Sequence, residues 1–151
     1  MISANIGIND FINSIDKTIE NIDDYLLDGL KECGEIIVDE SKKEFLKHFK
    51  MRSGRALNSI SILHVDNDSV EVGLDGSTEY AEYLHNGSVT HSVEPVTKKA
   101  LNFDGNKFSK GHVVSGIDGV PFMEIGIKNS ENKCVNLLDK KVNEAIKDAG
   151  I

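Results

Sequence analysis

The chain has 151 residues, of which 39% are hydrophobic and 28% are charged. This length fits one domain with a real core, and the composition is that of a globular rather than a disordered protein. The 17 basic and 25 acidic residues give a net charge of −8. That balance argues against binding DNA through its phosphates and against docking on an anionic membrane surface.

Targeting signals and cysteine usage point to the cytoplasm. No run of about 18 apolar residues is present, so the sequence predicts no transmembrane helix. The first ten residues lack Lys, Arg and an apolar segment of signal-peptide type. Cys33 and Cys134 each lie in an apolar periodic pattern, which favours buried free thiols. A disulfide between them is left open by the sequence.

The N-terminal third has the pattern of a helix that begins at an Asn9 N-cap, after an irregular lead-in over residues 1–8. The pattern runs for about 40 residues, and a straight helix of about 40 residues would span roughly 60 Å. We therefore expect a break within residues 21–24, giving a short helix and then a long one that ends near Lys50. The apolar residues recur mostly every three or four positions and predict one buried stripe: Phe11, Ile12, Ile15, Ile19, Ile22, Leu26, Leu30, Cys33, Ile37, Phe45 and Phe49.

The middle third is predicted to be rich in strands. The turn Asn67-Asp68 lies between two apolar runs and indicates a hairpin, and the irregular first run indicates a bulge. A short helix follows over Glu79 to His85, with Thr78 as its N-cap and Asn86-Gly87 as its end. Further strands are predicted at 90–94, 100–103 and 112–115, with a turn at 104–106 and a polar loop between Gly105 and Gly111.

A second long helix is predicted at the C-terminal end. Pro121 begins a turn, and a helix over residues 129–149 buries a stripe of Val135, Leu138, Val142 and Ile146, with Cys134 as a further candidate. The whole is an α+β domain: residues 1–50 helical, 53–119 an antiparallel sheet of four to five strands with a short inserted helix, and 121–151 the C-terminal helix.

The sequence offers little for catalysis. His85 and His91 are six apart and have no metal-ligand spacing, and no nucleophile elbow or phosphate-binding loop is present. Glu79 and Glu82 are best interpreted as a solvated helix face. We therefore expect no enzyme, no cofactor and no metal. A hydrolase with an unrecognised nucleophile would require His85, His91 and an acidic residue to converge.

Three short motifs stand in the middle of the chain. They are Ser53-Gly54-Arg55-Ala56-Leu57-Asn58-Ser59-Ile60, then Tyr80-Ala81-Glu82-Tyr83-Leu84-His85-Asn86-Gly87-Ser88, and then Pro121-Phe122-Met123. With the segment Pro95 to Phe103, they resemble the tail-completion or head–tail joining (neck) family of minor virion proteins of long-tailed bacteriophages. The resemblance covers roughly residues 50–125. It departs from the family pattern at Ala56-Leu57, at His85 and near Gly126.

The resemblance implies a structural virion protein without enzymatic activity. Such proteins assemble as rings around the DNA channel, here sixfold by preference and twelvefold as the alternative, through heterologous contacts. The implied partners are other copies of the chain, the head connector, and tail terminator or tube proteins. DNA would pass through without specific binding, along a lumen lined by acidic side chains. No membrane is involved, and the protein would lie in the virion neck or tail after assembly in the host cytoplasm.

The motif residues also suggest local roles. Tyr80 and Tyr83 share a helical face and are expected to pack on the sheet, while Phe122 anchors the last helix in the core. Subunit contacts are expected at His85, Asn86 and the 104–111 loop. The candidate motif and contact set is Ser53, Gly54, Arg55, Tyr80, Ala81, Tyr83, His85, Asn86, Gly87, Pro121 and Phe122. The alternative function is a small cytoplasmic protein-binding or regulatory module with an interaction helix.

Overall fold

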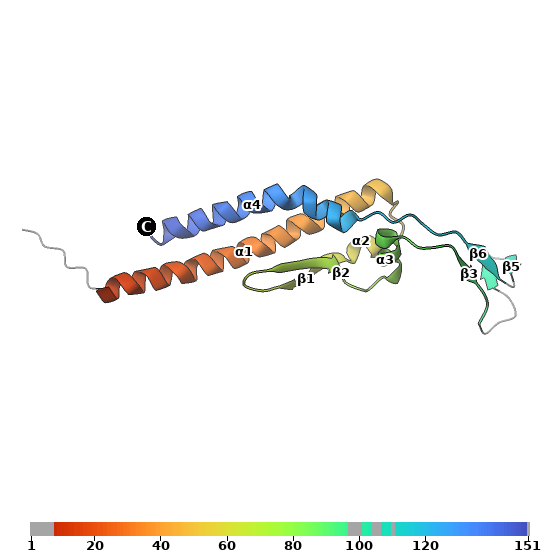
Figure 1. The fold of residues 1–151 in the computed structure, drawn as a ribbon, viewed down its shortest axis with the longest axis horizontal. Coiled ribbons are helices and arrows are strands. Elements are labelled where there is room, and N and C mark those ends of the chain that lie inside the picture. The colour runs from red at the N-terminus through yellow and green to blue at the C-terminus, as the bar shows by residue number, and fades with distance from the viewer. Residues whose placement is uncertain (1–7, 97–100, 104–106, 110, 151) are drawn as a thin grey trace, which may run out of the picture.

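The computed structural model describes residues 8–96, 101–103, 107–109 and 111–150. Two long helices, α1 (Ile8–His48) and α4 (Phe122–Asp148), lie side by side and antiparallel (Figure 1). The hairpin of β1 (Ile60–Val65) and β2 (Val70–Leu74) lies beside α1 (Figure 1). A narrow arm, which carries the strands between His91 and Val114, projects beyond the C-terminal end of α1 (Figure 1). The predicted α+β class, with a long helix towards each end of the chain, is confirmed.

The first helix is longer and simpler than predicted. α1 runs unbroken for 41 residues and ends at His48, close to the predicted end. The predicted break at 21–24 is wrong because Asn and Asp cost a helix interior only a few tenths of a kcal/mol each. Asn9 lies inside the helix, so it is not the N-cap. The predicted irregular lead-in is wrong at Ile8, which is helical, and its residues 1–7 lie outside the described part of the chain.

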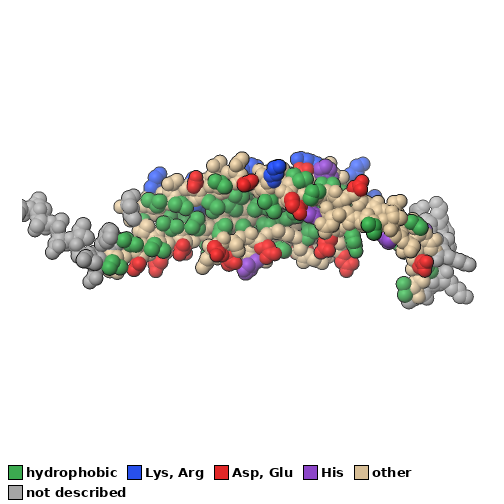
Figure 2. All heavy atoms as spheres, viewed as in Figure 1, with side chains coloured by type: hydrophobic (Ala, Val, Ile, Leu, Met, Phe, Trp, Pro, Cys, Tyr) green, Lys and Arg blue, Asp and Glu red, His purple; other side chains and the backbone are tan. Residues whose placement is uncertain are grey.

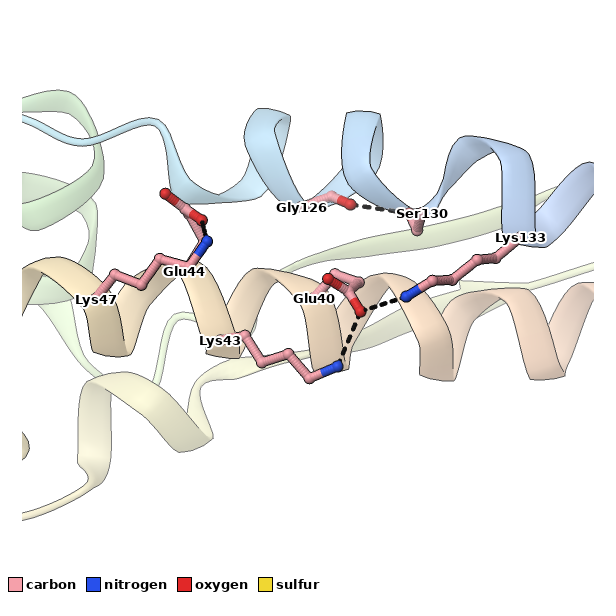
Figure 3. Close-up of polar contacts among 7 residues, drawn as sticks. All are labelled: Glu40, Lys43, Glu44, Lys47, Gly126, Ser130 and Lys133. Atoms are coloured by element: carbon pink, nitrogen blue, oxygen red, sulfur yellow. Dashed lines mark hydrogen bonds and ion pairs between the residues drawn. The ribbon is translucent and has the colours of Figure 1, made fainter.

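Small residues bring α1 and α4 close together. A Cβ placed on Gly126 would lie 2.7 Å from the Ser41 Cα, so only glycine allows this approach. Ser130 is buried and donates its hydroxyl to the Gly126 carbonyl at 2.9 Å (Figure 3). Further along, each sulfur of Cys33 and Cys134 contacts the other residue's backbone carbonyl, at 3.8 and 3.9 Å. We call these five residues the small-residue seam.

Ion pairs along the edges of the seam fix its register. Lys133 of α4 and Lys43 of α1 both donate to Glu40, at 2.8 and 2.9 Å (Figure 3). These two hydrogen bonds, first that of Lys133, lower the pKa of Glu40 to about 2. Lys141 likewise joins Asp28 and Glu32 at 2.7 and 2.6 Å, and these carboxylates raise its pKa.

α4 begins earlier than predicted, at Phe122 rather than at 129. Gly126 suggests a helix breaker in the sequence, but its lack of a side chain is what admits Ser41. Leu138, Val142 and Ile146 are half-buried, whereas Val135 is 55% exposed, so its place in the buried stripe was wrong. Cys134, the further candidate, is half-buried and faces α1.

The β1–β2 hairpin matches its prediction closely. Ile60 pairs with Leu74 and Val65 with Val70, and the register shifts between Ile62 and His64, which confirms the bulge. The hairpin rests on α1 at Gly34, where an added Cβ would lie 2.8 Å from side-chain atoms of Ile62 and Val70. Glycine inside α1 therefore makes room for the hairpin.

The arm corrects the prediction of a single sheet. Among the described strands, β3 (His91–Val93) pairs only with β6 (His112–Val114), and β4 (Leu101–Phe103) pairs only with β5 (Lys107–Ser109). These ladders are two-stranded and lie apart from β1–β2 (Figure 1). These three-residue strands lie in the arm, too far from β1 and β2 to pair with them in one sheet. β5 also replaces part of the predicted 105–111 loop, and the predicted turn at 104–106 lies outside the described residues.

The first turns of α1 extend past the end of α4 (Figure 1). Tyr25 contacts Asp148, the last residue of α4, so we call residues 8–24, which precede this contact, the overhang. Ile12, Ile15 and Ile19 are 48%, 39% and 52% exposed there. The buried stripe predicted for α1 is therefore wrong at these three positions, because no element among the described residues buries them.

Candidate functional site

The three sequence motifs meet at one place, which we call the motif junction. It lies where the C-terminal end of α1 meets α2 (Arg55–Asn58), α3 (Glu79–Asn86) and the start of α4. The short helix α2 was not predicted. The buried residues that form the junction core are Phe45, Ala56, Ile60, Ala81, Phe122 and Met123.

Phe122 is the centre of the junction. It is fully buried, and its ring centroid lies 5.3 Å from that of Phe45, 6.5 Å from that of Phe49 and 4.8 Å from that of His85. Each contact is edge-to-face, the geometry that favours aromatic pairs. The prediction that Phe122 anchors the last helix in the core is confirmed. Pro121, just before it, is exposed at the N-cap position of α4.

A segment over residues 116–120 crosses the end of α3 in close contact. Val120 donates its N–H to the Leu84 carbonyl at 3.0 Å, and Ser88 and Ile117 exchange backbone hydrogen bonds. A Cβ on Gly119 would lie 2.3 Å from the Gly87 nitrogen. Gly87 itself has φ 81°, a value that L side chains rarely adopt, and ends α3 as predicted. Thr78 holds the predicted N-cap position, without a side-chain hydrogen bond to the helix.

His85 makes contacts within its own chain. Its Nε2 lies 2.6 Å from a Glu124 carboxylate oxygen, and its Nδ1 lies 2.8 Å from the Asn86 side-chain oxygen. The His85 side chain is only 13% exposed. The expectation that His85 is exposed is therefore wrong, whereas its role as a subunit contact stays a prediction. Asn86 is exposed, and its role as a contact stays a prediction.

The two tyrosines of α3 do not pack on a sheet. Tyr80 and Tyr83 are 47% and 56% exposed, so their predicted core role is wrong. They point away because α3 buries Ala81 instead, on its opposite face. Both tyrosines line a shallow hollow with Arg55, Ser77, Thr78 and Glu79.

An apolar groove opens beside the junction, with a volume of about 470 Å³. Its apolar walls include Met51, which is 61% exposed, and Tyr80. Ser53 and Gly54 of the first motif lie on its rim, and Lys50 and Arg52 supply positive charge there. The remaining lining residues are Phe45, Phe49, Ala56, Leu57 and Leu84. We call this feature the groove.

The groove was missed at the sequence level, although a signal for it exists. Residues 47–55 hold four basic side chains and no acidic one, in a chain of net charge −8. Alternating with them are Phe49 and Met51, both groove-lining residues. A basic, partly apolar run of this kind after a long helix is a local sign of a positively charged, partly apolar surface.

No group of three His, Cys, Asp or Glu side chains arranged to hold a metal ion occurs within the described residues. His91 lies in the arm and contacts the Val89 carbonyl, away from the His85–Glu124 pair. His85, His91 and an acidic residue therefore do not converge. Of the helices described, none is long and apolar enough to cross a membrane.

Both cysteines are free thiols, as expected. Cys33 is buried, and this burial, with a contribution from Cys134, raises its pKa to about 12. A thiol in that state is a packing group rather than a nucleophile.

Comparison with protein-family models, curated proteins and solved structures finds no significant match to this chain.

Proposed function

We propose that the protein is a structural virion component that forms a ring at the phage head–tail joint or tail end and continues the DNA channel. The observation that supports this most is the motif junction. Residues of the three motifs lie far apart in the sequence, yet Ala56, Ile60, Ala81, Phe122 and Met123 share one core. Motifs that meet in one core belong to one structural unit, as the resemblance to the joining family implies.

The shape of the molecule is compatible with a ring subunit. A ring requires each copy to present two different surfaces, one to each neighbour. The chain is elongated, with the overhang at one end of the helices and the arm at the other (Figure 1). The groove is lined by residues from the C-terminal end of α1, which is the end opposite the overhang. In this proposal a sixfold ring contacts the connector on one side and the tail terminator or tube on the other, and its acidic side chains repel DNA phosphates in the lumen.

The test is the composition and assembly of phage particles. Mass spectrometry of purified virions should find the protein, and a phage lacking its gene should accumulate filled heads and unattached or incomplete tails. Supplying Phe122→Leu from a plasmid should restore assembly, because an apolar side chain of similar size keeps the junction packed. Absence of the protein from virions, with normal particles in the deletion strain, would overturn the proposal.

One observation favours a second candidate, a small protein-binding module. The groove is apolar and concave, like many peptide-binding sites. The same deletion experiment separates the two functions, because a regulatory module would change the yield or timing of particles without leaving heads and tails unjoined.

A further inference from the structure

The overhang is an amphipathic helix segment whose Ile12, Ile15 and Ile19 are left exposed by the described part of the chain. Ile12, Ile15 and Ile19 lie at positions i, i+3 and i+7, so they form one stripe on the helix. Figure 2 shows hydrophobic side chains along the face between α1 and α4 and continuing onto α1 beyond the end of α4. Five acidic residues and one lysine give the overhang a charge of −4. Of these, Asp16, Glu20, Asp23 and Asp24 are exposed.

The overhang cannot reach the groove of its own chain. Ile15 and Phe45 belong to the same unbroken helix, 30 residues apart, and are therefore separated by about 45 Å along its axis. Any contact between the two surfaces has to join two copies of the protein.

The groove matches the overhang in chemistry. It is an apolar cleft whose walls include the exposed Met51 and Tyr80. The run 47–55 carries four positive charges. Lys47 is paired with Glu44, but Lys50, Arg52 and Arg55 take part in no ion pair within the described part of the chain. Among the residues that line the groove and the hollow, Glu79 is the one acidic residue, and it lines the hollow together with Arg55.

We propose that the overhang of one copy docks in the groove of the next, head to tail. This inference rests on the homo-oligomeric part of the proposed function and names the surfaces involved. Ile12, Ile15 and Ile19 enter the cleft in the manner of a helix in a groove, which uses anchors at i, i+3 and i+7. The −4 overhang faces the basic rim, which steers the copies together and sets their direction. Because the two surfaces differ, the contact is heterologous and extends to a ring when its rotation closes.

The test uses one variant on each surface. Ile15→Asp places a charge in the overhang stripe, and Met51→Asp places one in the groove. Both side chains are partly or largely exposed, so each full-length variant should keep the helical content of the wild type by circular dichroism. Val135→Asp, at a comparably exposed position on α4, is the matched control. Analytical ultracentrifugation and mass photometry report the association.

The wild type and Val135→Asp should associate with increasing concentration, and less so at high salt, which screens the charged rim. Ile15→Asp and Met51→Asp should each associate at least about tenfold more weakly, since losing one buried aliphatic anchor is worth that much. An equimolar mixture of the two variants should form dimers, because an intact overhang from Met51→Asp fits an intact groove from Ile15→Asp.

Three results would overturn the inference. They are a wild type that stays monomeric at every concentration, a Met51→Asp variant that associates like the wild type, or a mixture that stays monomeric. A Met51→Asp protein that still self-associates while Ile15→Asp does not would show that overhangs pair with each other. None of these results concerns whether the protein is in virions, so the failure of this inference and the failure of the proposed function are distinguishable.

Discussion

The two halves of α1 carry the same kind of sequence and have opposite surroundings. In the C-terminal half the apolar stripe lies against α4 and the β1–β2 hairpin, and Cys33, Ser41 and Phe45 are buried. In the N-terminal half the stripe is exposed at Ile12, Ile15 and Ile19. The period of three and four residues is the same in both. Periodicity thus tells which face of a helix is apolar, but the length of the partner helix decides whether that face is covered.

The largest expected effect on stability comes from truncating Phe122, which packs against the C-terminal half of α1. The comparison is a truncation of Ile19 in the N-terminal half. Phe122→Ala should lower the free energy of unfolding by about 3–5 kcal/mol, because it leaves a cavity against Phe45 and Phe49. Ile19→Ala in the overhang should change it by less than about 0.5 kcal/mol in the monomer. Urea unfolding at a concentration where the protein is monomeric measures both. Similar losses for the two variants would mean that the overhang is packed in solution.

A second pair of variants sharpens the comparison along the α1–α4 contact itself. Gly126→Ala should destabilise by about 2–3 kcal/mol, since the new methyl group would overlap the backbone of Ser41. Gly29→Ala meets only the movable side chains of Leu138 and Lys141, and alanine favours helix by about 1 kcal/mol. It should therefore stay within about 1 kcal/mol of the wild type. Denaturant midpoints measure the difference, and equal effects would contradict a close approach confined to Gly126.

The smallest effect concerns acid stability of the covered half. The pKa of Glu40 in the folded protein is lowered from 4.5 to about 2. Its contribution to the free energy of unfolding is therefore complete above pH 4.5 and is lost as the pH falls towards about 2. Glu40→Gln should remove at most about 1 kcal/mol at neutral pH, because its lysine partners are exposed. It should also flatten the loss of stability below pH 4.5.

Glu35→Gln is the matched control for that experiment, because Glu35 is an exposed carboxylate on α1 without an ion pair in the described structure. Its acid unfolding curve should follow that of the wild type. If Glu35→Gln flattened the curve as much as Glu40→Gln, the pairing with Lys133 would not be the cause.

Features set by neighbouring residues could be predicted from the sequence. The β1–β2 hairpin followed from Asn67-Asp68 between two apolar runs, and the end of α3 followed from Asn86-Gly87. Features set by distant residues could not. Gly126 resembles a helix breaker until Ser41 is placed against it, and Ile12 resembles a core residue until α4 is seen to end before it.

The candidate site divides in the same way. Phe122 could be assigned to the core because a buried anchor is the common role of such a residue, whereas the exposure of Tyr80 depends on how α3 is rotated in the fold. The groove is assembled from residues of α1, α2 and α3 and the loop before α2, so no single stretch describes it. Only the acid-free run over 47–55 gave a local sign of it.

The reactivity of the buried Cys33 thiol can report how often α1 and α4 separate. With a pKa of about 12 and almost no exposed surface, it is closed to alkylating reagents while the helices are together. Alkylation of Cys33 therefore requires a local opening in which the two helices separate. The rate of alkylation at Cys33, followed by mass spectrometry, would give the frequency at which the two helices separate, without a cysteine introduced by mutation. It would also show whether assembly into a larger particle slows this separation.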